Sequence, residues 1–320
     1  MQPAVSIVMP TFNRPKYLRA AIDSVFNQSF RDWEFLIADD GSGPETQDFL
    51  RTLEDPPRIK VFRLSHTGNP GAVRNAALRE AKGEYVAFLD SDDVWMPQKL
   101  QMQIESLRSH IGREWSYTGF TLVDDSGSPL TGARAKRCPA IDGWILDPLI
   151  REEAFVVQSS VVVRRELIQR LGGYDDDLPV CEDYELGVRL AQHSEIDFID
   201  EPLVLLRRHR EHSFDDIACL ENLKRALEKI QRSGAVSHLD AVLKRRRAII
   251  SANLARGHAL CKNRLRVLTI LGSSARYSWR YRDWWIGALA ATVRAFAPAA
   301  ALSAARRYRP GGRFKFGPRT

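Results

Sequence analysis

Short apolar runs alternate with amphipathic segments over the first hundred residues of the chain. The runs are rich in aromatic and β-branched residues, and their length predicts strands buried in a sheet. They are Val5–Met9, Glu34–Ala38, Ile59–Phe62 and Tyr85–Leu89. The segments between them have helical periodicity, and three carry a proline near the first turn. They are Pro15–Gln28, Pro44–Leu53, Gly71–Ala81 and Pro97–Ser109. This rhythm predicts an α/β fold, a mostly parallel sheet flanked by helices.

The pattern changes after Glu114, where strands no longer alternate regularly with helices. We predict strands over Trp115–Thr118, Thr121–Val123, Ser159–Val163 and Phe198–Leu206. Short helices are predicted over Glu166–Leu171 and Tyr184–Gln192. Beyond Phe214 the chain is expected to be mainly helical. A chain of 320 residues is long enough for two domains, or for one domain with an appendage.

The net charge of +7 conceals two oppositely charged parts. Residues 241–320 hold 18 Lys or Arg and a single acid, a net charge of +17, which leaves −10 for residues 1–240. Such asymmetry suggests an anionic partner, nucleic acid or a membrane surface, for the basic part.

The remaining composition narrows the class of protein. The four cysteines show no C-x-x-C spacing, which argues against a zinc site or a disulfide framework and fits a reducing compartment. The run Val5–Met9 is too short for a signal peptide, and no apolar run is long enough to span a bilayer. We therefore expect a cytoplasmic protein.

Polar residues follow four of the predicted strands of the N-terminal half. The segments are Pro10–Pro15, Asp39–Ser42, Gly68–Asn75 and Asp90–Asp93. Carboxyl ends of parallel strands meet at one edge of a sheet, where open α/β sheets bind their ligands. Arg74, near the start of a predicted helix, adds positive charge where a phosphate can sit.

The acids that end the fourth strand are the strongest candidates for metal binding. Asp90 and Asp92 point the same way from an extended backbone, and Asp93 adjoins them. Three close carboxylates repel one another, so the site favours a divalent cation with oxygen ligands. The alternative for a D-x-D motif by itself is a solvated acidic loop.

Several blocks of the sequence, in order and spacing, resemble the family-2 inverting glycosyltransferases with the GT-A fold. They are SIVMPTFNR, ADDGS, GAVRNAAL followed by AKGEYVAFLDSDD, and GGYD followed by EDYEL. The resemblance extends from about Val5 to Ser213. It implies a catalytic domain over residues 1–213, with a nucleotide-binding half (1–110) and an acceptor-binding half (111–213). Residues 214–320 then form a basic helical C-terminal region.

The resemblance also implies an activity and roles for individual residues. A sugar would move from a nucleotide diphosphate-sugar to a glycan or lipid-linked saccharide acceptor, with Mn²⁺ or Mg²⁺ as cofactor. UDP is the default nucleotide, while GDP and dTDP stay open. Asp39 would recognise the nucleoside, Asp90 the ribose or metal-nucleotide, and Asp92 the metal. Pro10, Thr11 and Arg14 would line the nucleotide pocket.

Inversion at the sugar requires a general base that takes the proton of the acceptor hydroxyl. In the family this is the Asp of an E-D pair after a G-G-Y segment, which here is Asp183. The alternative is that Glu182 and Asp183 only favour the N-terminus of the helix that follows them. A further segment, Arg207–Ser213, resembles the family's closing loop, so His209 is a second metal ligand or binds the leaving phosphate with Arg207. Trp95 either stacks on a sugar or is a hydrophobic residue at the start of a helix.

Three interpretations of the basic C-terminal region stay open. Aromatic residues beside arginines, as in Tyr277–Trp285, fit attachment to an anionic lipid surface at the inner face of the membrane. A helical subdomain that packs on the catalytic core is the second interpretation. Nucleic-acid binding shares the charge signal but lacks a motif, so we expect no nucleic-acid partner.

Other functions fit the sequence less well. A sugar nucleotidyltransferase normally has a glycine-rich loop after the first strand, where this chain has Pro10–Arg14. A phospho-acceptor receiver needs its acidic pair after the first strand and an acceptor Asp after the third, and neither is present. A catalytically inactive nucleotide-sugar-binding scaffold is disfavoured by the intact Asp39, Asp90, Asp92 and Asp183.

Overall fold

The structure is a computed structural model that describes residues 2–53, 58–130, 140–208 and 216–296. The chain divides into two compact units. The first comprises Met1–Leu149 and Ala154–Ser213, and the second comprises Ile150–Glu153 and Phe214–Thr320. His209 lies outside the described residues.

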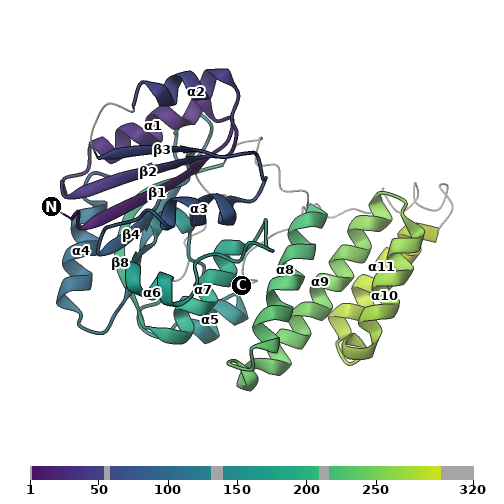
Figure 1. The fold of residues 1–320 in the computed structure, drawn as a ribbon. Coiled ribbons are helices and arrows are strands. Elements are labelled where there is room, and N and C mark those ends of the chain that lie inside the picture. Colours follow the sequence, from purple (N-terminus) through teal and green to yellow (C-terminus); the bar gives the residue numbers. More distant parts are fainter. Residues whose placement is uncertain (1, 54–57, 131–139, 209–215, 297–320) are drawn as a thin grey trace. The chain divides into compact units, whose positions relative to one another are not determined.

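The first unit is an α/β domain, and most of its elements are labelled in Figure 1. Its strands are β1 (Val5–Thr11), β2 (Trp33–Asp39), β3 (Ile59–Arg63), β4 (Tyr85–Phe88), β5 (Val94–Trp95), β6 (Trp115–Val123), β7 (Val162–Arg164) and β8 (Ile196–Arg207). Its helices are α1 (Pro15–Phe26), α2 (Pro44–Arg51), α3 (Pro70–Leu78), α4 (Lys99–Ser109), α6 (Arg165–Arg170), α7 (Glu182–His193) and the 3-10 turn η2 (Gln158–Ser160); α5 (Leu146–Arg151) lies at the boundary of the units.

One eight-stranded sheet runs through this unit in the order β3-β2-β1-β4-β7-β6-β8-β5. The pairs β3-β2, β2-β1, β1-β4 and β6-β8 are parallel, whereas β7 and β5 pair antiparallel with their neighbours. The prediction of a mostly parallel sheet flanked by helices is therefore confirmed.

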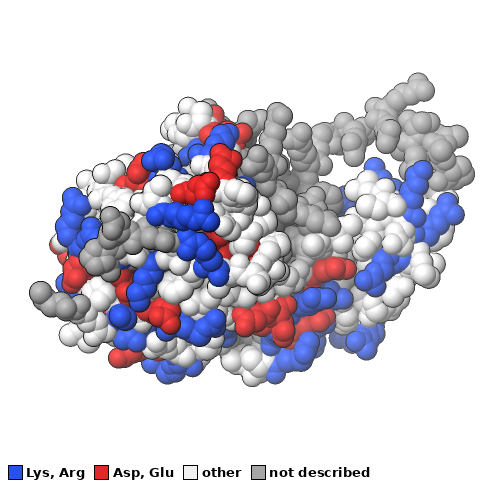
Figure 2. Space-filling model, turned by 45° about the horizontal axis from the view of Figure 1, so that its top comes forward, with Lys and Arg blue, Asp and Glu red and all other residues white. Residues whose placement is uncertain are grey.

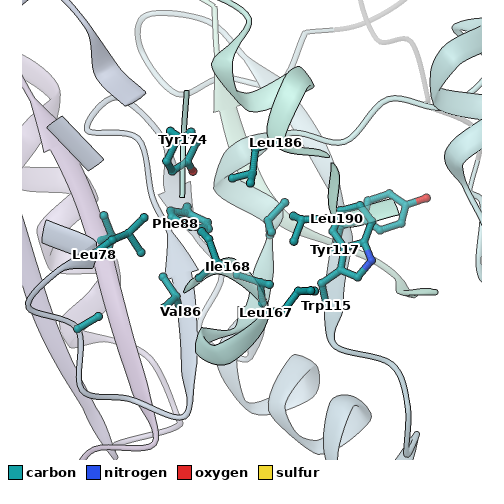
Figure 3. Packing of buried hydrophobic residues seen from close by; sticks show 14 of the residues in the cluster. Leu78, Val86, Phe88, Trp115, Tyr117, Leu167, Ile168, Tyr174, Leu186 and Leu190 are labelled. Atoms are coloured by element: carbon teal, nitrogen blue, oxygen red, sulfur yellow. The ribbon is translucent and has the colours of Figure 1, made fainter. Parts of the chain in front are cut away.

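The sheet is buried on both faces because helices cover both of them. Alternate residues of β1 enter different cores: Ile7 packs with α1 and α4, and Val8 packs with α3 and α7. Figure 3 shows the second core, where Phe88 of β4 lies among side chains of α3, α6 and α7. Phe88 meets the Tyr174 ring edge to face, with centroids 5.6 Å apart. Burial on both faces explains the continuous apolar runs in the sequence.

Some elements differ from the predictions in instructive ways. The two strands predicted over 115–123 are one strand, β6, whose register with β8 shifts around Gly119. The strand predicted over Ser159–Val163 is wrong in its first half, which is the turn η2. The helix predicted to begin at Tyr184 begins at Glu182, so the Glu182-Asp183 pair forms part of its first turn.

The second unit is helical, as predicted. Its elements are α8 (Asp216–Arg232), the 3-10 turn η3 (Ser237–Leu239), α9 (Asp240–Leu260), α10 (Arg264–Ser278) and α11 (Arg282–Phe296). Helix α9 contacts α8, α10 and α11. Small residues let the helices approach closely: a Cβ on Gly287 of α11 would lie 2.6 Å from the Ala252 Cβ of α9. No helix in the described ranges is long and apolar enough to cross a membrane.

Candidate functional site

The ends of β1 and β2 bring Thr11 and Asp39 side by side, because the two strands are parallel and these residues are register partners. Both are buried. The Asp39 carboxylate accepts a hydrogen bond from the Ser42 amide at 3.2 Å. Thr11 is only 3% exposed, and its hydroxyl has no hydrogen-bond partner among the described residues. A buried hydroxyl is normally paired, so this pair of side chains suits a polar ligand.

The loops after these two strands are fixed to each other. Asn13 accepts a hydrogen bond from the Gly43 amide at 2.8 Å, and its own amide donates to the Ser42 hydroxyl at 2.9 Å. Gly41 has φ of +78°, and a Cβ there would lie 2.9 Å from the His66 backbone nitrogen. The ADDGS turn therefore requires glycine at this position for two separate reasons.

The two aspartates of the ADDGS turn make different contacts. Asp40 is buried and accepts hydrogen bonds from the amides of Thr67 at 2.8 Å and Gly68 at 2.9 Å. It therefore anchors the loop that precedes α3. The Asp39 carboxylate accepts from the Ser42 amide of its own turn, and its choice as the nucleoside ligand stays a prediction.

The other predicted residues of the nucleotide pocket lie at the end of β1 and in the loop from β1 to α1. Pro10 is a half-buried residue of β1, and Arg14 is the half-buried residue that precedes α1. Phe12, 39% exposed, stacks on the His66 ring with centroids 4.0 Å apart. Their contacts with a nucleotide stay predictions.

The three acids that follow β4 have different surroundings. Asp93 is buried, and its carboxylate accepts hydrogen bonds from the Ser159 hydroxyl at 2.6 Å and the Arg207 amide at 2.9 Å. Burial, followed by the charges of Asp92 and Asp90, raises the pKa of Asp93 well above its usual range. Asp93 is thus a structural carboxylate.

Ser159 and Arg207 hold the acidic loop in place. The Ser159 hydroxyl accepts from the Asp90 amide at 3.0 Å in addition to its bond to Asp93. The Arg207 guanidinium donates to the carbonyls of Asp92, Asp124 and Asp125 at 2.9 to 3.1 Å. These bonds to backbone carbonyls give Arg207 a structural role. Sequence reasoning missed Ser159, although a pair of serines inside a buried apolar segment was a usable signal.

Trp95 does not stack on a sugar. Its residue is 2% exposed, and its indole nitrogen donates to the Ser159 carbonyl at 2.7 Å. Trp95 is a buried hydrophobic residue as one interpretation held, but it belongs to strand β5 and not to the start of a helix, since α4 begins at Lys99.

The carboxylates suit a divalent cation through their chemistry. Among the described residues no group of three or more His, Cys, Asp and Glu side chains is arranged to hold a metal ion. Asp90, Asp92 and Asp93 are close enough that the charges of the first two add to the effect of burial on the pKa of Asp93, and a cation would reduce this repulsion. Carboxylate oxygens are the donors that Mg²⁺ and Mn²⁺ prefer. Asp92 therefore fits as a metal ligand, and the predicted second ligand, His209, lies outside the described residues.

Arg74 joins the acidic loop to the start of α7. Its guanidinium donates to Asp90 at 2.6 Å and to Glu182 at 2.7 Å, and the residue is 4% exposed. Burial opposes the charge on Arg74, but Asp90, Tyr174 and Glu182 outweigh burial and raise its pKa. The structure thus places Arg74 between two carboxylates, and its predicted contact with a phosphate stays a prediction.

The Glu182-Asp183 pair begins α7 beside this guanidinium. Burial and the charge of Asp183 raise the pKa of Glu182 to about 7, although Arg74 acts in the opposite direction. Burial also raises the pKa of Asp183, with Arg74 again opposing and Asp90 adding to the rise. Cys181, which precedes the pair, has φ of +64°, a conformation that non-glycine residues seldom adopt outside constrained sites.

The surroundings of Asp183 are compatible with both roles that the sequence left open. Its carboxylate accepts from the Tyr184 amide at 2.7 Å, and negative charge in the first turn is favoured by the helix dipole. A carboxylate with a raised pKa at the same place is also suited to take up a proton. The two roles are compatible.

Helix α3 fixes the segment that leads to this pair. Asn75 donates to the Tyr174 carbonyl and accepts from the Tyr174 amide, both at 2.9 Å. Asn69 donates to the Asp176 carbonyl at 2.7 Å. A Cβ on Gly71 would lie 3.1 Å from the Glu182 side chain, so the helix and the pair are in close contact. Sequence reasoning named the blocks but missed Asn75 and Glu182 as the residues that connect them.

These features define an α/β domain of the GT-A type. Among solved structures, the chain is similar to S. aureus TarS 1-349 in complex with UDP-GlcNAc, with a TM-score of 0.65 and 18% identity over 97% of this chain and 93% of that one. It is also similar to a mannosyltransferase from Pyrobaculum calidifontis in complex with GDP-Man and Mn²⁺, with a TM-score of 0.57 and 17% identity over 97% of this chain and 89% of that one. At such identities these likenesses show the fold alone.

Residues 6–111 match the model of the family described as Glycosyl transferase family 2. A putative teichuronic acid biosynthesis glycosyltransferase of Bacillus subtilis, TuaG, is 39% identical over 130 residues, which cover 40% of this chain and 51% of TuaG. The Escherichia coli WfgD, a UDP-Glc:alpha-D-GlcNAc-diphosphoundecaprenol beta-1,3-glucosyltransferase, is 40% identical over 123 residues, which cover 38% of this chain and 47% of WfgD. Residues 6–111 thus match glycosyl transferase family 2, and the relatives are named glycosyltransferases, so the resemblance read from the sequence is confirmed. The chain spans about half the length of these two relatives.

Proposed function

We propose that the chain is a metal-dependent inverting glycosyltransferase. It moves a sugar from a nucleotide diphosphate-sugar, in the first place a UDP-sugar, to a hydroxyl of a glycan or lipid-linked saccharide. The observation that carries this proposal is the position of Arg74, which connects Asp90 of the acidic loop with the Glu182-Asp183 pair. A candidate base and a candidate nucleotide site are thereby held in one fixed arrangement.

The proposed reaction assigns one step to each group. Asp183 accepts the proton of the acceptor hydroxyl as its oxygen attacks the anomeric carbon of the sugar. The bond from that carbon to the diphosphate breaks on the opposite face, which inverts the configuration. Asp39 and Thr11 bind the nucleoside, and Asp90 binds the ribose. Mn²⁺ or Mg²⁺, held by Asp92 and His209, supplies positive charge for the leaving diphosphate.

The relatives support both the donor and the kind of product. WfgD is named for a UDP-glucose donor and a diphosphoundecaprenol-linked acceptor, and TuaG for teichuronic acid biosynthesis. A solved structure of the same fold carries UDP-GlcNAc. We therefore place the proposed activity in the assembly of a cell-surface polysaccharide or glycolipid.

A thermal-shift panel of UDP, GDP, dTDP and CDP, each with and without Mn²⁺, tests the proposal on the full chain. A nucleotide that binds only the folded protein stabilises it by about 2.7 kcal/mol at about a hundredfold excess over Kd. We expect one diphosphate to raise Tm in a metal-dependent way, and Asp92→Ala to abolish the shift. Absence of a shift with every nucleotide would contradict the proposal.

The assignment of the base needs a second variant. Asp183→Asn is expected to keep the metal-dependent shift but to lose sugar transfer by about 10²- to 10⁴-fold. Asp200→Asn, which neutralises an exposed carboxylate of β8, is the matched control and should leave both unchanged. Full transfer by Asp183→Asn would show that another group is the base.

A further inference from the structure

Helix α11 has two apolar faces, and residues of the described ranges bury only one of them. Trp284, Ala288, Ala291 and Ala295 are buried in clusters that α9 completes. The opposite face is exposed. Its residues, here called the α11 face, are Trp285 (56% exposed), Ile286 (58%), Leu289 (67%), Val293 (51%) and Phe296 (42%). A surface helix normally shows only one apolar stripe, so the second stripe needs a partner.

Exposed apolar side chains are concentrated in this part of the second unit. Of the 14 large hydrophobic residues that are exposed in the described part of the chain, nine lie between Leu260 and Phe296. Trp279, 55% exposed, adjoins the α11 face, because the Trp285 indole donates to its carbonyl at 2.8 Å. Scattered apolar residues need no explanation, but such a concentration marks a binding surface.

Arginines accompany the apolar residues. Residues 264–296 contain six Arg and one acid, Asp283, whose carboxylate is paired with Arg245 at 2.8 Å. Arg280 lies over the Trp279 ring, 5.0 Å from its centroid. Within the described ranges, Arg280, Arg282 and Arg294 have no carboxylate partner. Where Figure 1 has α10 and α11, Figure 2 shows blue side chains among white ones.

We propose that the α11 face binds the surface of an anionic lipid bilayer. Its apolar side chains would enter the boundary between headgroups and acyl chains, and Arg280, Arg282 and Arg294 would meet the lipid phosphates. The 15 residues of α11 are too few to span a bilayer core, which takes about 20, so the helix lies in the plane of the interface.

The charge pattern favours a lipid surface over other occupants. A second copy of this chain would place arginines opposite arginines, with no carboxylate on α10 or α11 except the already paired Asp283. Nucleic acid would satisfy the arginines but would leave the side chains of Ile286, Leu289 and Val293 unused. An anionic bilayer satisfies both kinds of side chain.

Flotation of the full chain with vesicles tests this proposal without any sugar transfer, so its outcome is independent of the proposed function. We expect binding to vesicles of equal parts phosphatidylglycerol and phosphatidylcholine, and little binding to phosphatidylcholine alone. Replacing Arg280, Arg282 and Arg294 together by Gln should weaken binding roughly a hundredfold, since each basic residue near an anionic surface contributes about 1 kcal/mol. Replacing Ile286, Leu289 and Val293 together by Ser should weaken it at least as much.

A matched control separates a specific face from general stickiness. Ile111→Ser with Trp144→Ser removes two exposed apolar side chains of the first unit, 100% and 60% exposed, and should leave binding unchanged. The six substituted side chains, three in each variant, lie at the surface, so far-UV circular dichroism should be unaltered. If the Ser variant nevertheless fails to fold, the Gln variant decides. Unchanged flotation of the Gln variant would overturn the proposal. So would a dimer, measured by light scattering, that the Ser variant dissociates while the wild-type chain does not bind vesicles.

Discussion

Glu182 offers a direct test of the electrostatics of the site. Its carboxylate is subject to two opposed effects: burial beside Asp183 favours the protonated form, and Arg74 at 2.7 Å favours the ionised form. Burial and Asp183 prevail, since the pKa rises from 4.5 to about 7. A carboxylate with a raised pKa stabilises the folded state most below pH 4.5, and this stabilisation is lost as pH rises through about 7.

The substitution Glu182→Gln removes this dependence on pH and keeps the shape of the protonated side chain. A rise of the pKa from 4.5 to about 7 corresponds to about 3 kcal/mol of unfolding free energy between the two ends of the window. We expect the variant to match the wild type near pH 5 and to be more stable by up to about 3 kcal/mol at pH 8. Urea unfolding at both pH values measures this difference.

A second carboxylate provides a control of opposite sign. Although burial acts to raise the pKa of Asp142, its bonds from Arg113 and the Phe198 amide prevail and lower it. Asp142→Asn should therefore lose stability at neutral pH and regain it in acid. If Glu182→Gln instead becomes less stable relative to the wild type as pH rises, the ion pair with Arg74 dominates and the reasoning is refuted.

Two further predictions follow from contacts in the first unit. Ser159→Ala removes the hydroxyl that joins Asp90 and Asp93. It should lower the unfolding free energy in urea by about 1–3 kcal/mol and weaken the metal-dependent thermal shift. An unchanged shift would mean that Ser159 does not position the acidic loop. Gly41→Ala combines a φ of +78° with a Cβ 2.9 Å from the His66 backbone, and should cost about 1–3 kcal/mol, whereas Gly187→Ala, a helical position with open space around it, should not destabilise. Equal Tm values for the two glycine variants would contradict this account.

The fold was largely predictable because its strands are buried on both faces and leave apolar runs that can be recognised one at a time. The exceptions depend on distant contacts. Strand β5 (Val94–Trp95) is two residues long and exists through its pairing with β8, so it leaves no periodic signal. The first half of the strand predicted over Ser159–Val163 is a turn, because its polar groups bind distant residues. The Ser159 hydroxyl is hydrogen-bonded to Asp90 and Asp93, and the Ser160 carbonyl accepts from Gln103.

The candidate site was predictable as a set of strand ends but not as a set of contacts. Parallel pairing places Asp39 and the acidic loop at one edge of the sheet, and that much follows from the order of the elements. The pairing of Arg74 with Glu182 joins residues that are 108 positions apart, and no local sequence pattern predicts it. For the same reason the sequence did not predict that Asn75 binds Tyr174, which is 99 positions away.

These distant contacts change how the sequence blocks are understood. Arg74 and Asn75 of the GAVRNAAL block have their hydrogen bonds with Asp90, Glu182 and Tyr174, which belong to the other blocks. At this junction Asp90 and Glu182 pair with one guanidinium, and Asp183 adjoins Glu182. Burial, together with the charges of the neighbouring carboxylates, raises the pKa values of Glu182 and Asp183, while Arg74 opposes the rise. Burial near other carboxylates favours the protonated form of Asp183. The proposed uptake of a proton from an acceptor hydroxyl at Asp183 is consistent with the same electrostatics that make the pair costly to bury.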